Sequence, residues 1–224
     1  MAACTATDIG VSNVTIKRSR IAGGCDYLLR YADFNGSYNI KLIDVELVGG
    51  AVQMKGNGYS WLRVNAHSFK GKAAMMGTGT SVEDSYIHDN SCTPPDHQSG
   101  IGTNGGANNI VMRHNNVDLT PGECTSGAIA NYDDFGAFSD VLIEKNQINS
   151  AGYCLKAGFE LGASSGSNMR VIDNVFGRKY FPECGYFGVV SNWFNGNGNV
   201  WSGNTWGGGA AATSAHAVGS TVNP

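Results

Sequence analysis

Apolar residues recur along the chain in one template: an apolar residue, four intervening residues and a second apolar residue. Successive first members lie between 18 (Val64 to Val82) and 31 (Met112 to Ile143) residues apart. The template fits Ile16/Ile21, Leu42/Leu47, Val64/Phe69, Val82/Ile87, Met112/Val117, Ile143/Ile148, Val171/Phe176 and Trp201/Trp206. A repeat of this length is typical of a solenoid in which each step is one coil.

A second short strand is predicted after each template, and residues that favour tight turns separate the two. Gly, Asn, Ser and Asp fill these intervals, and no segment shows a sustained helical period. The predicted second strands begin at Tyr27, Ala51, Ala73, Gly100, Gly127, Cys154 and Gly185. The pattern predicts an all-β, right-handed parallel β-helix of about eight coils over residues 1–206, followed by a Gly/Ala-rich tail over 207–224.

The fourth position of the template carries asparagine in four consecutive coils: Asn115, Asn146, Asn174 and Asn204. Stacked strands lie about 4.8 Å apart, a spacing at which side-chain amides can bond up and down a ladder. These residues are therefore interpreted as structural, at a bend of the solenoid.

Six cysteines suggest a disulfide framework and an oxidising compartment. Register alone predicts the pairs Cys4–Cys25, Cys92–Cys124 and Cys154–Cys184, with Cys124–Cys154 as an open alternative. The chain starts without the charged and apolar regions of a signal peptide. The cysteines therefore favour a mature secreted chain with an added Met over a protein that never had a signal.

Composition excludes several partners. Charged residues make up 15% of the chain and the net charge is −3, so no nucleic-acid partner is indicated. No apolar run approaches the roughly 20 residues of a membrane-spanning helix. We expect a monomer.

Several segments between Val82 and Trp206 carry a resemblance to a known family. They are Val82–His88, Asp96–Gly102, Asn109–Asn115, Asp134–Gly136, Asn174–Arg178 and Trp201–Trp206. In their order and spacing the chain resembles secreted bacterial, especially actinobacterial, right-handed β-helix proteins of the pectate-lyase-like superfamily. The resemblance implies this fold, an extracellular location and a polysaccharide as substrate or ligand.

One segment departs from the family pattern His-x-Asp-Gly-Ile-Gln. This chain keeps His97, Gly100 and Ile101 but has Ser99 in place of the aspartate and Gly102 in place of the glutamine. If that aspartate has a chemical role in relatives, this protein lacks it or uses Asp96 instead. The departure favours a non-catalytic glycan-binding or surface protein.

The loops of coils four to seven carry the titratable residues, and they favour an enzyme. On a uronic-acid polymer the expected reaction is β-elimination, in which a base removes the C5 proton and a cation neutralises the adjacent carboxylate. Lys156 or His97 would be the base. Asp96, Asp133 and Asp134 could hold Ca²⁺, which prefers oxygen ligands; no cofactor is certain.

A glycoside hydrolase is the alternative chemistry, since Asp96, Asp133, Asp134 and Glu160 could supply its two carboxylates. The same site hypothesis assigns substrate binding to a further set of loop and strand residues. They are His88, Asn131, Tyr132, Arg178, Glu160 and Trp193. The candidate catalytic and binding residues also have structural interpretations: His97 can brace its loop, Asp134 can form a turn, and the aromatic residues can pack.

Overall fold

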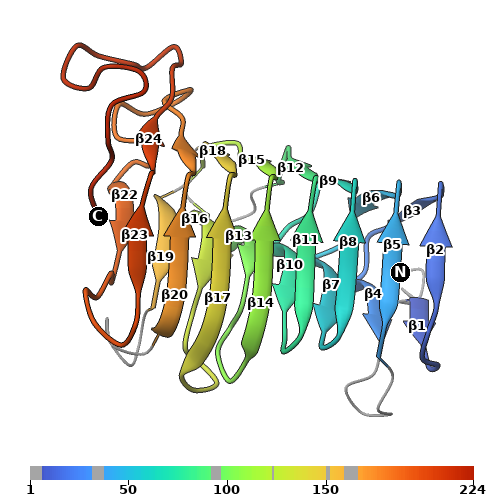
Figure 1. Cartoon of the computed structure of the whole chain (residues 1–224). Helices are drawn as coiled ribbons and strands as arrows, with labels where there is room; N and C mark the ends of the chain where they lie inside the picture. Colours follow the sequence, from blue (N-terminus) through green and yellow to red (C-terminus); the bar gives the residue numbers. More distant parts are fainter. Residues whose placement is uncertain (1–6, 32–37, 92–96, 123, 150–151, 159–165) are drawn as a thin grey trace.

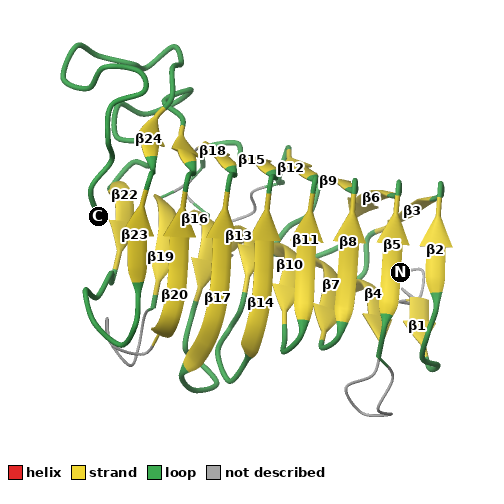
Figure 2. Cartoon of the chain, viewed as in Figure 1, coloured by secondary structure: helices red, strands yellow, loops and turns green. Residues whose placement is uncertain are grey.

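The computed structural model describes residues 7–31, 38–91, 97–122, 124–149, 152–158 and 166–224. Over these residues the chain winds into a parallel β-helix with three sheets along its length (Figures 1 and 2). In Figure 1 the chain runs up through the near sheet, over the short strands at the top and down through the far sheet, while it advances from right to left. This winding is right-handed, as the sequence predicts.

Each sheet has eight described strands, one from each coil, and all neighbours within the sheets are parallel. Sheet A contains β1 (Thr7–Ile9), β4 (Tyr27–Tyr31), β7 (Val52–Gly56), β10 (Lys72–Met76), β13 (Gln98–Gly102), β16 (Thr125–Asn131), β19 (Tyr153–Ala157) and β22 (Gly188–Ser191). Sheet B contains β2 (Thr15–Lys17), β5 (Ile40–Ile43), β8 (Tyr59–Leu62), β11 (Thr80–Glu83), β14 (Asn108–Arg113), β17 (Phe138–Glu144), β20 (Gly166–Ile172) and β23 (Val200–Ser202). Sheet C contains β3 (Arg20–Gly23), β6 (Glu46–Gly49), β9 (Asn65–His67), β12 (Tyr86–His88), β15 (Asn116–Asp118), β18 (Gln147–Asn149), β21 (Val175–Phe176) and β24 (Thr205–Trp206).

The strand register confirms seven of the eight predicted templates and corrects the third. Leu42 pairs with Trp61 and Leu47 with Ala66, so the template of this coil is Trp61/Ala66. The predicted Val64 instead occupies the bend, where it is buried. The sequence favours the apolar Val64 as the first template residue because the true second member, Ala66, is small and does not stand out as a core residue.

The template spans two strands and not one, since it runs from sheet B through a sharp bend into sheet C. The residue before the ladder position has positive φ in successive coils, as at His114 (55°), Lys145 (55°) and Asp173 (55°). This left-handed backbone conformation turns the chain. Each coil therefore has three strands where the sequence predicts two.

The predicted asparagine ladder is present at this bend. The Oδ1 of Asn146 accepts hydrogen bonds from the backbone N–H (2.9 Å) and the Nδ2 (3.0 Å) of Asn115. The Nδ2 of Asn146 donates to the Met112 carbonyl (2.9 Å) and to the Oδ1 of Asn174 (3.0 Å). Asn204 continues the pattern below Asn174. The amides thus satisfy backbone groups that the bend removes from the sheets.

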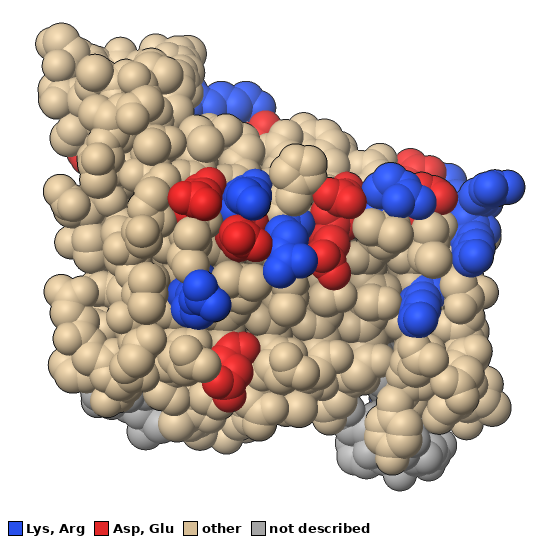
Figure 3. Space-filling model, in the orientation of Figure 1, with Lys and Arg blue, Asp and Glu red and all other residues tan. Residues whose placement is uncertain are grey.

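Charged side chains at the ends of the sheet B strands pair with each other across neighbouring coils, and Figure 3 shows a band of blue and red on this face. Arg63 Nε lies 2.6 Å from Asp44 Oδ1, and Arg113 Nε lies 2.8 Å from Glu144 Oε2. Both pairs are substantially solvent-exposed, so they add little stability. They do neutralise one another over this face.

The residues after Trp206 cover the last coil. The Val222 side chain is fully buried, and its carbonyl accepts a hydrogen bond from Trp201 Nε1 (2.7 Å). The fully buried Arg178 donates to the carbonyls of Gly207 (2.8 Å) and His216 (2.7 Å). The segment 207–224 therefore acts as a cap that hides the apolar end of the solenoid.

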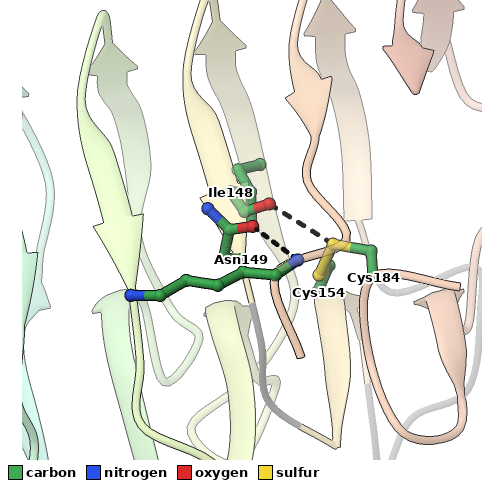
Figure 4. The surroundings of a disulfide bond; sticks show 5 residues. Ile148, Asn149, Cys154 and Cys184 are labelled. Carbon is green, nitrogen blue, oxygen red and sulfur yellow. Dashed lines mark hydrogen bonds between the residues drawn. A yellow bond between two sulfur atoms is a disulfide. The ribbon is translucent and has the colours of Figure 1, made fainter. Parts of the chain in front are cut away.

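The structure confirms the Cys154–Cys184 disulfide and thereby removes the alternative Cys124–Cys154. Figure 4 shows this disulfide beside β18, where Cys184 Sγ lies 3.4 Å from the Ile148 carbonyl oxygen. Cys25 and Cys124 are also disulfide-bonded. The other members of their predicted pairs, Cys4 and Cys92, lie outside the described residues. None of the described segments forms a helix that is long and apolar enough to span a bilayer.

Removal of this disulfide is expected to destabilise the C-terminal coils. The bond closes a loop with a sequence separation of 30 residues, for which chain entropy gives about 3–4 kcal/mol. Denaturant unfolding of a Cys154→Ala/Cys184→Ala double variant would measure the loss. An unchanged unfolding midpoint would contradict this expectation.

Candidate functional site

A groove with a cavity volume of about 530 Å³ lies on the outer face of sheet A, which is the far sheet in Figure 1. It crosses the strands from β7 to the segment before β22, and so runs along the solenoid axis. Its lining residues are Val52, Gly71, Lys72, Met75, His97, Ser99, Asn104, Thr125, Ser126, Tyr132, Asp134, Gly152, Tyr153, Lys156 and Phe187.

The groove exists because the two middle strands carry small residues at outward positions. One outward row, in register across four strands, reads Lys72, Ser99, Gly127 and Tyr153. The large side chains stand at its two ends, and the small ones lie between them on β13 and β16. The row is therefore hollow at Ser99, which lines the cavity, whereas a Cβ atom on Gly127 would lie 3.4 Å from Lys156 Cγ.

A second row has Met75 beside Gly102 and Ala130 beside Lys156, and of these four residues Met75 and Lys156 line the cavity. Gly102 has φ of 141°, and a Cβ atom there would lie 2.1 Å from the Ala130 carbonyl oxygen. No side chain fits this position. The glycine found where the family pattern has glutamine is thus required by the close approach of β16.

Lys72 crosses the hollow from β10 and reaches β16. Its Nζ donates to Asn104 Oδ1 (2.7 Å) and makes longer hydrogen bonds to the carbonyls of Thr103 (3.4 Å) and Ala130 (3.3 Å). Only 4% of its surface is exposed, and the Tyr132 ring centroid lies 5.0 Å from Nζ. Burial lowers the pKa of Lys72 to about 7.

The depressed pKa of Lys72 predicts a pH dependence of stability. The unfolded state binds this proton up to a pKa of about 10.5, but the folded state releases it near 7. The free energy of unfolding should therefore rise between pH 7 and 10, by up to about 1.4 kcal/mol per pH unit. In a Lys72→Met variant this rise should be clearly smaller, leaving the part that Lys156 contributes, whereas a Lys55→Met control on the same sheet should keep the full rise. Denaturant midpoints across this range would test the expectation.

Tyr132 lies between the two lysines of the groove. Its ring centroid is 5.0 Å from Lys72 Nζ and 5.7 Å from Lys156 Nζ. The hydroxyls of Ser99 and Ser126 hydrogen-bond to its phenol oxygen, while burial, the larger effect, raises the pKa of Tyr132. The phenol therefore holds its proton and could donate it.

Lys156 and His97 flank Tyr132 from separate elements. The half-buried Lys156 also lies against the Tyr153 ring, with Nζ 5.4 Å from the centroid, and burial lowers its pKa. The exposed His97 lies at the rim, where its Nδ1 is 3.4 Å from Ser126 Oγ. The groove thus brings together three residues of the site hypothesis: His97, Tyr132 and Lys156.

Asp134 also reaches the groove, and among its described lining residues it is the single carboxylate. Its Oδ2 accepts a hydrogen bond from Asn104 Nδ2 (3.2 Å), so Asn104 links it to Lys72. Asp133 is buried and does not line the cavity. Within the described part of the chain, no group of three or more His, Cys, Asp or Glu residues could hold a metal ion. Asp96 and Glu160 lie outside the described residues.

Four further predicted binding residues lie away from the groove. Asn131 is fully buried, and its Nδ2 faces Met169 Sδ inside the core. Arg178 belongs to the cap, and Trp193 packs edge-on against Trp201 near the last coil. His88 lies on sheet C, stacked between Tyr86 and His67.

Sequence reasoning missed Lys72, Asn104, Ser126, Tyr153 and Phe187. Lys72 did carry a signal, as a cation at the start of the otherwise apolar strand Lys72–Met76. Ser99 was noticed only as a departure from the family pattern. Its role appears once the strand register places it in the floor of the groove.

Comparison with protein-family models, curated proteins and solved structures found no match for this chain. The parallel β-helix agrees with the fold that the sequence resemblance implies. The finer assignment to pectate-lyase-like or actinobacterial proteins has no such support and stays a prediction.

Proposed function

We propose that the protein is a secreted enzyme of the pectate-lyase-like kind that cleaves a uronic-acid-containing polysaccharide by β-elimination in the sheet A groove. The observation that carries the proposal is the Lys72–Tyr132–Lys156 cluster on the groove floor. It combines a buried lysine that an approaching carboxylate would charge, a protonated phenol and a second amine of lowered pKa within one cavity.

The shape of the groove suits a linear polymer. The cavity crosses β10, β13, β16 and β19, which are spaced at about 4.8 Å per strand. A polysaccharide lying along the solenoid axis would contact outward side chains from several coils at once. The uronate at the reacting position would lie over β13 and β16, whose Ser99 and Ser126 line the cavity.

Lys72 and Asn104 would bind the uronate carboxylate. The approach of a carboxylate favours the charged form of Lys72 and offsets the effect of burial on its pKa. Neutralising the carboxylate lets negative charge develop at C5. A preorganised ammonium, already held by three oxygen acceptors, provides this without rearrangement.

Lys156 in its neutral form would accept the C5 proton. The electrons of the C5–H bond form the C4–C5 double bond, and the bond from C4 to the glycosidic oxygen breaks. Tyr132 donates its proton to that leaving oxygen and recovers one from Lys156 after the products depart. No water is consumed, and one product carries an unsaturated end.

Hydrolysis is less well supported, because it needs two carboxylates about 5–9.5 Å apart on either side of the bond. Asp134 is the single described carboxylate in the groove. A calcium site built on Asp96 stays a prediction, since that residue lies outside the described part of the chain.

Incubation with a panel of acidic and neutral polysaccharides, with and without calcium, tests the proposal. Ultraviolet absorbance and reducing ends rising together on a uronate polymer are the expected result. Reducing ends without absorbance would indicate hydrolysis and overturn the elimination. If the folded protein releases no product from the whole panel, the enzyme proposal fails and glycan binding without turnover becomes the leading function.

A further inference from the structure

The C-terminal end of the groove is formed by aromatic side chains. Phe187 and Tyr153 both line the cavity, with ring centroids 5.6 Å apart. Phe187 is 67% exposed, and the adjacent Tyr186, which packs edge-on against it at 4.8 Å, is 70% exposed. Contiguous exposed aromatic surface costs hydration free energy and commonly marks a binding site.

The backbone, and not burial of the rings, holds these aromatics in place. The Cys154–Cys184 disulfide anchors the segment before Phe187, and the Phe187 N–H donates to the Gly152 carbonyl at 2.7 Å. A Cβ atom on Gly185 would lie 2.8 Å from the Tyr153 Cα, so this turn packs directly on β19. A segment whose backbone is fixed before binding loses less entropy when a ligand covers its side chains.

The charge distribution in the groove differs between this end and the middle. Lys72, Asn104 and Asp134 gather over β10 to β16, whereas the described lining residues beside Phe187 are Tyr153, Gly152 and the flanking Lys156. Lys156 is neutral in the proposed mechanism, so a carboxylate placed over the Phe187 ring would lose hydration without gaining a cationic partner. An uncharged sugar with an axial cluster of C–H groups would instead bury apolar surface against the ring.

We propose that Phe187 and Tyr153 form a subsite for a neutral sugar residue next to the uronate, so that the substrate is a heteropolymer in which uronate and neutral sugars alternate. This inference rests on the proposed function, because it takes the uronate to lie over the groove floor. Tyr153 lies on β19, which pairs directly with β16 under the proposed uronate position and is one strand spacing away from it. Adjacent sugar units would therefore occupy the two positions.

Calorimetric titration in a Lys156→Gln background, which prevents cleavage during measurement, tests the subsite. The probes are a uronate homo-oligosaccharide and an oligosaccharide of equal length that alternates uronate with a neutral hexose. Phe187→Ala is expected to weaken binding of the alternating probe by about tenfold and of the homo-oligosaccharide by less than about threefold. Tyr38→Ala, which removes a similarly exposed aromatic residue that does not line the groove, should change neither.

Equal weakening for both probes would overturn the neutral-sugar assignment, as would unchanged binding of the alternating probe. Failure of the parent protein to bind the alternating probe would overturn it too. Turnover of the wild-type protein on each polymer is measured separately. Selective loss of binding without any wild-type turnover would therefore support the subsite while overturning the catalytic proposal.

Discussion

Replacing Lys156 with glutamine is expected to lower turnover on a uronate polymer by about 10²- to 10⁴-fold, the usual contribution of a general base. Glutamine keeps most of the side-chain length against Tyr132 and Tyr153 but cannot accept the C5 proton. Because Lys156 is only half-buried, the fold should persist, and circular dichroism and the unfolding midpoint would check this. The rate of unsaturated product formation is the measurement.

Lys55→Gln is the matched control, because Lys55 stands in the same outward row of sheet A, on β7 beyond Met75. It also lies near an aromatic ring, with Nζ 5.8 Å from the Tyr27 centroid, but it does not line the groove. Its replacement should leave turnover within about twofold. A loss in this control comparable to that of Lys156→Gln would point to general attraction of an anionic polymer and against a base at Lys156.

Replacing Asn146 with alanine is expected to lower the free energy of unfolding by about 3–5 kcal/mol. The change leaves the Asn115 N–H, the Met112 carbonyl and the Asn174 side chain without their partner at a buried bend. Each unsatisfied buried group costs about 1–3 kcal/mol, although relaxation recovers part of the sum. Equilibrium unfolding in denaturant would measure the loss.

Asn116→Ala provides the control for the ladder, since Asn116 is the exposed neighbour of a ladder residue on the adjacent coil. It should change the free energy of unfolding by less than about 0.5 kcal/mol. If the two variants lose similar stability, loss of the ladder hydrogen bonds cannot be the cause.

The fold was predictable because its repeat is local. Strand pairing in a solenoid places each residue above its counterpart one coil earlier, so the spacing of Met112, Ile143 and Val171 carries the register directly. The same logic placed Asn146 in a ladder and paired Cys154 with Cys184. The prediction was wrong for the third template, because the second member of that template, Ala66, is too small to stand out in the apolar pattern.

The site was predictable only in part. His97, Tyr132, Asp134 and Lys156 carry functional groups that can be recognised in a list of loop and strand residues, and the groove gathers all four. Arg178 carries an equally conspicuous group, but it holds the C-terminal cap. Nothing in the sequence near Arg178 indicates whether this residue binds a ligand in the groove or holds the cap. The answer depends on where the segment after Arg178 packs, which the local sequence does not specify.

The sequence by itself determined the solenoid, its coil spacing and its ladder, since all of these follow from one-dimensional periodicity. It left the partner of Cys154 open between Cys184 and Cys124, and the structure decided for Cys184. Only the tertiary structure decided where the groove lies. Its lining comes from residues far apart in the chain, such as Met75, Ser99 and Lys156, and Lys72 reaches over β13 to Ala130 on β16. The shape of such a cavity depends on the sizes of residues in neighbouring coils. These residues become neighbours only when the coils stack.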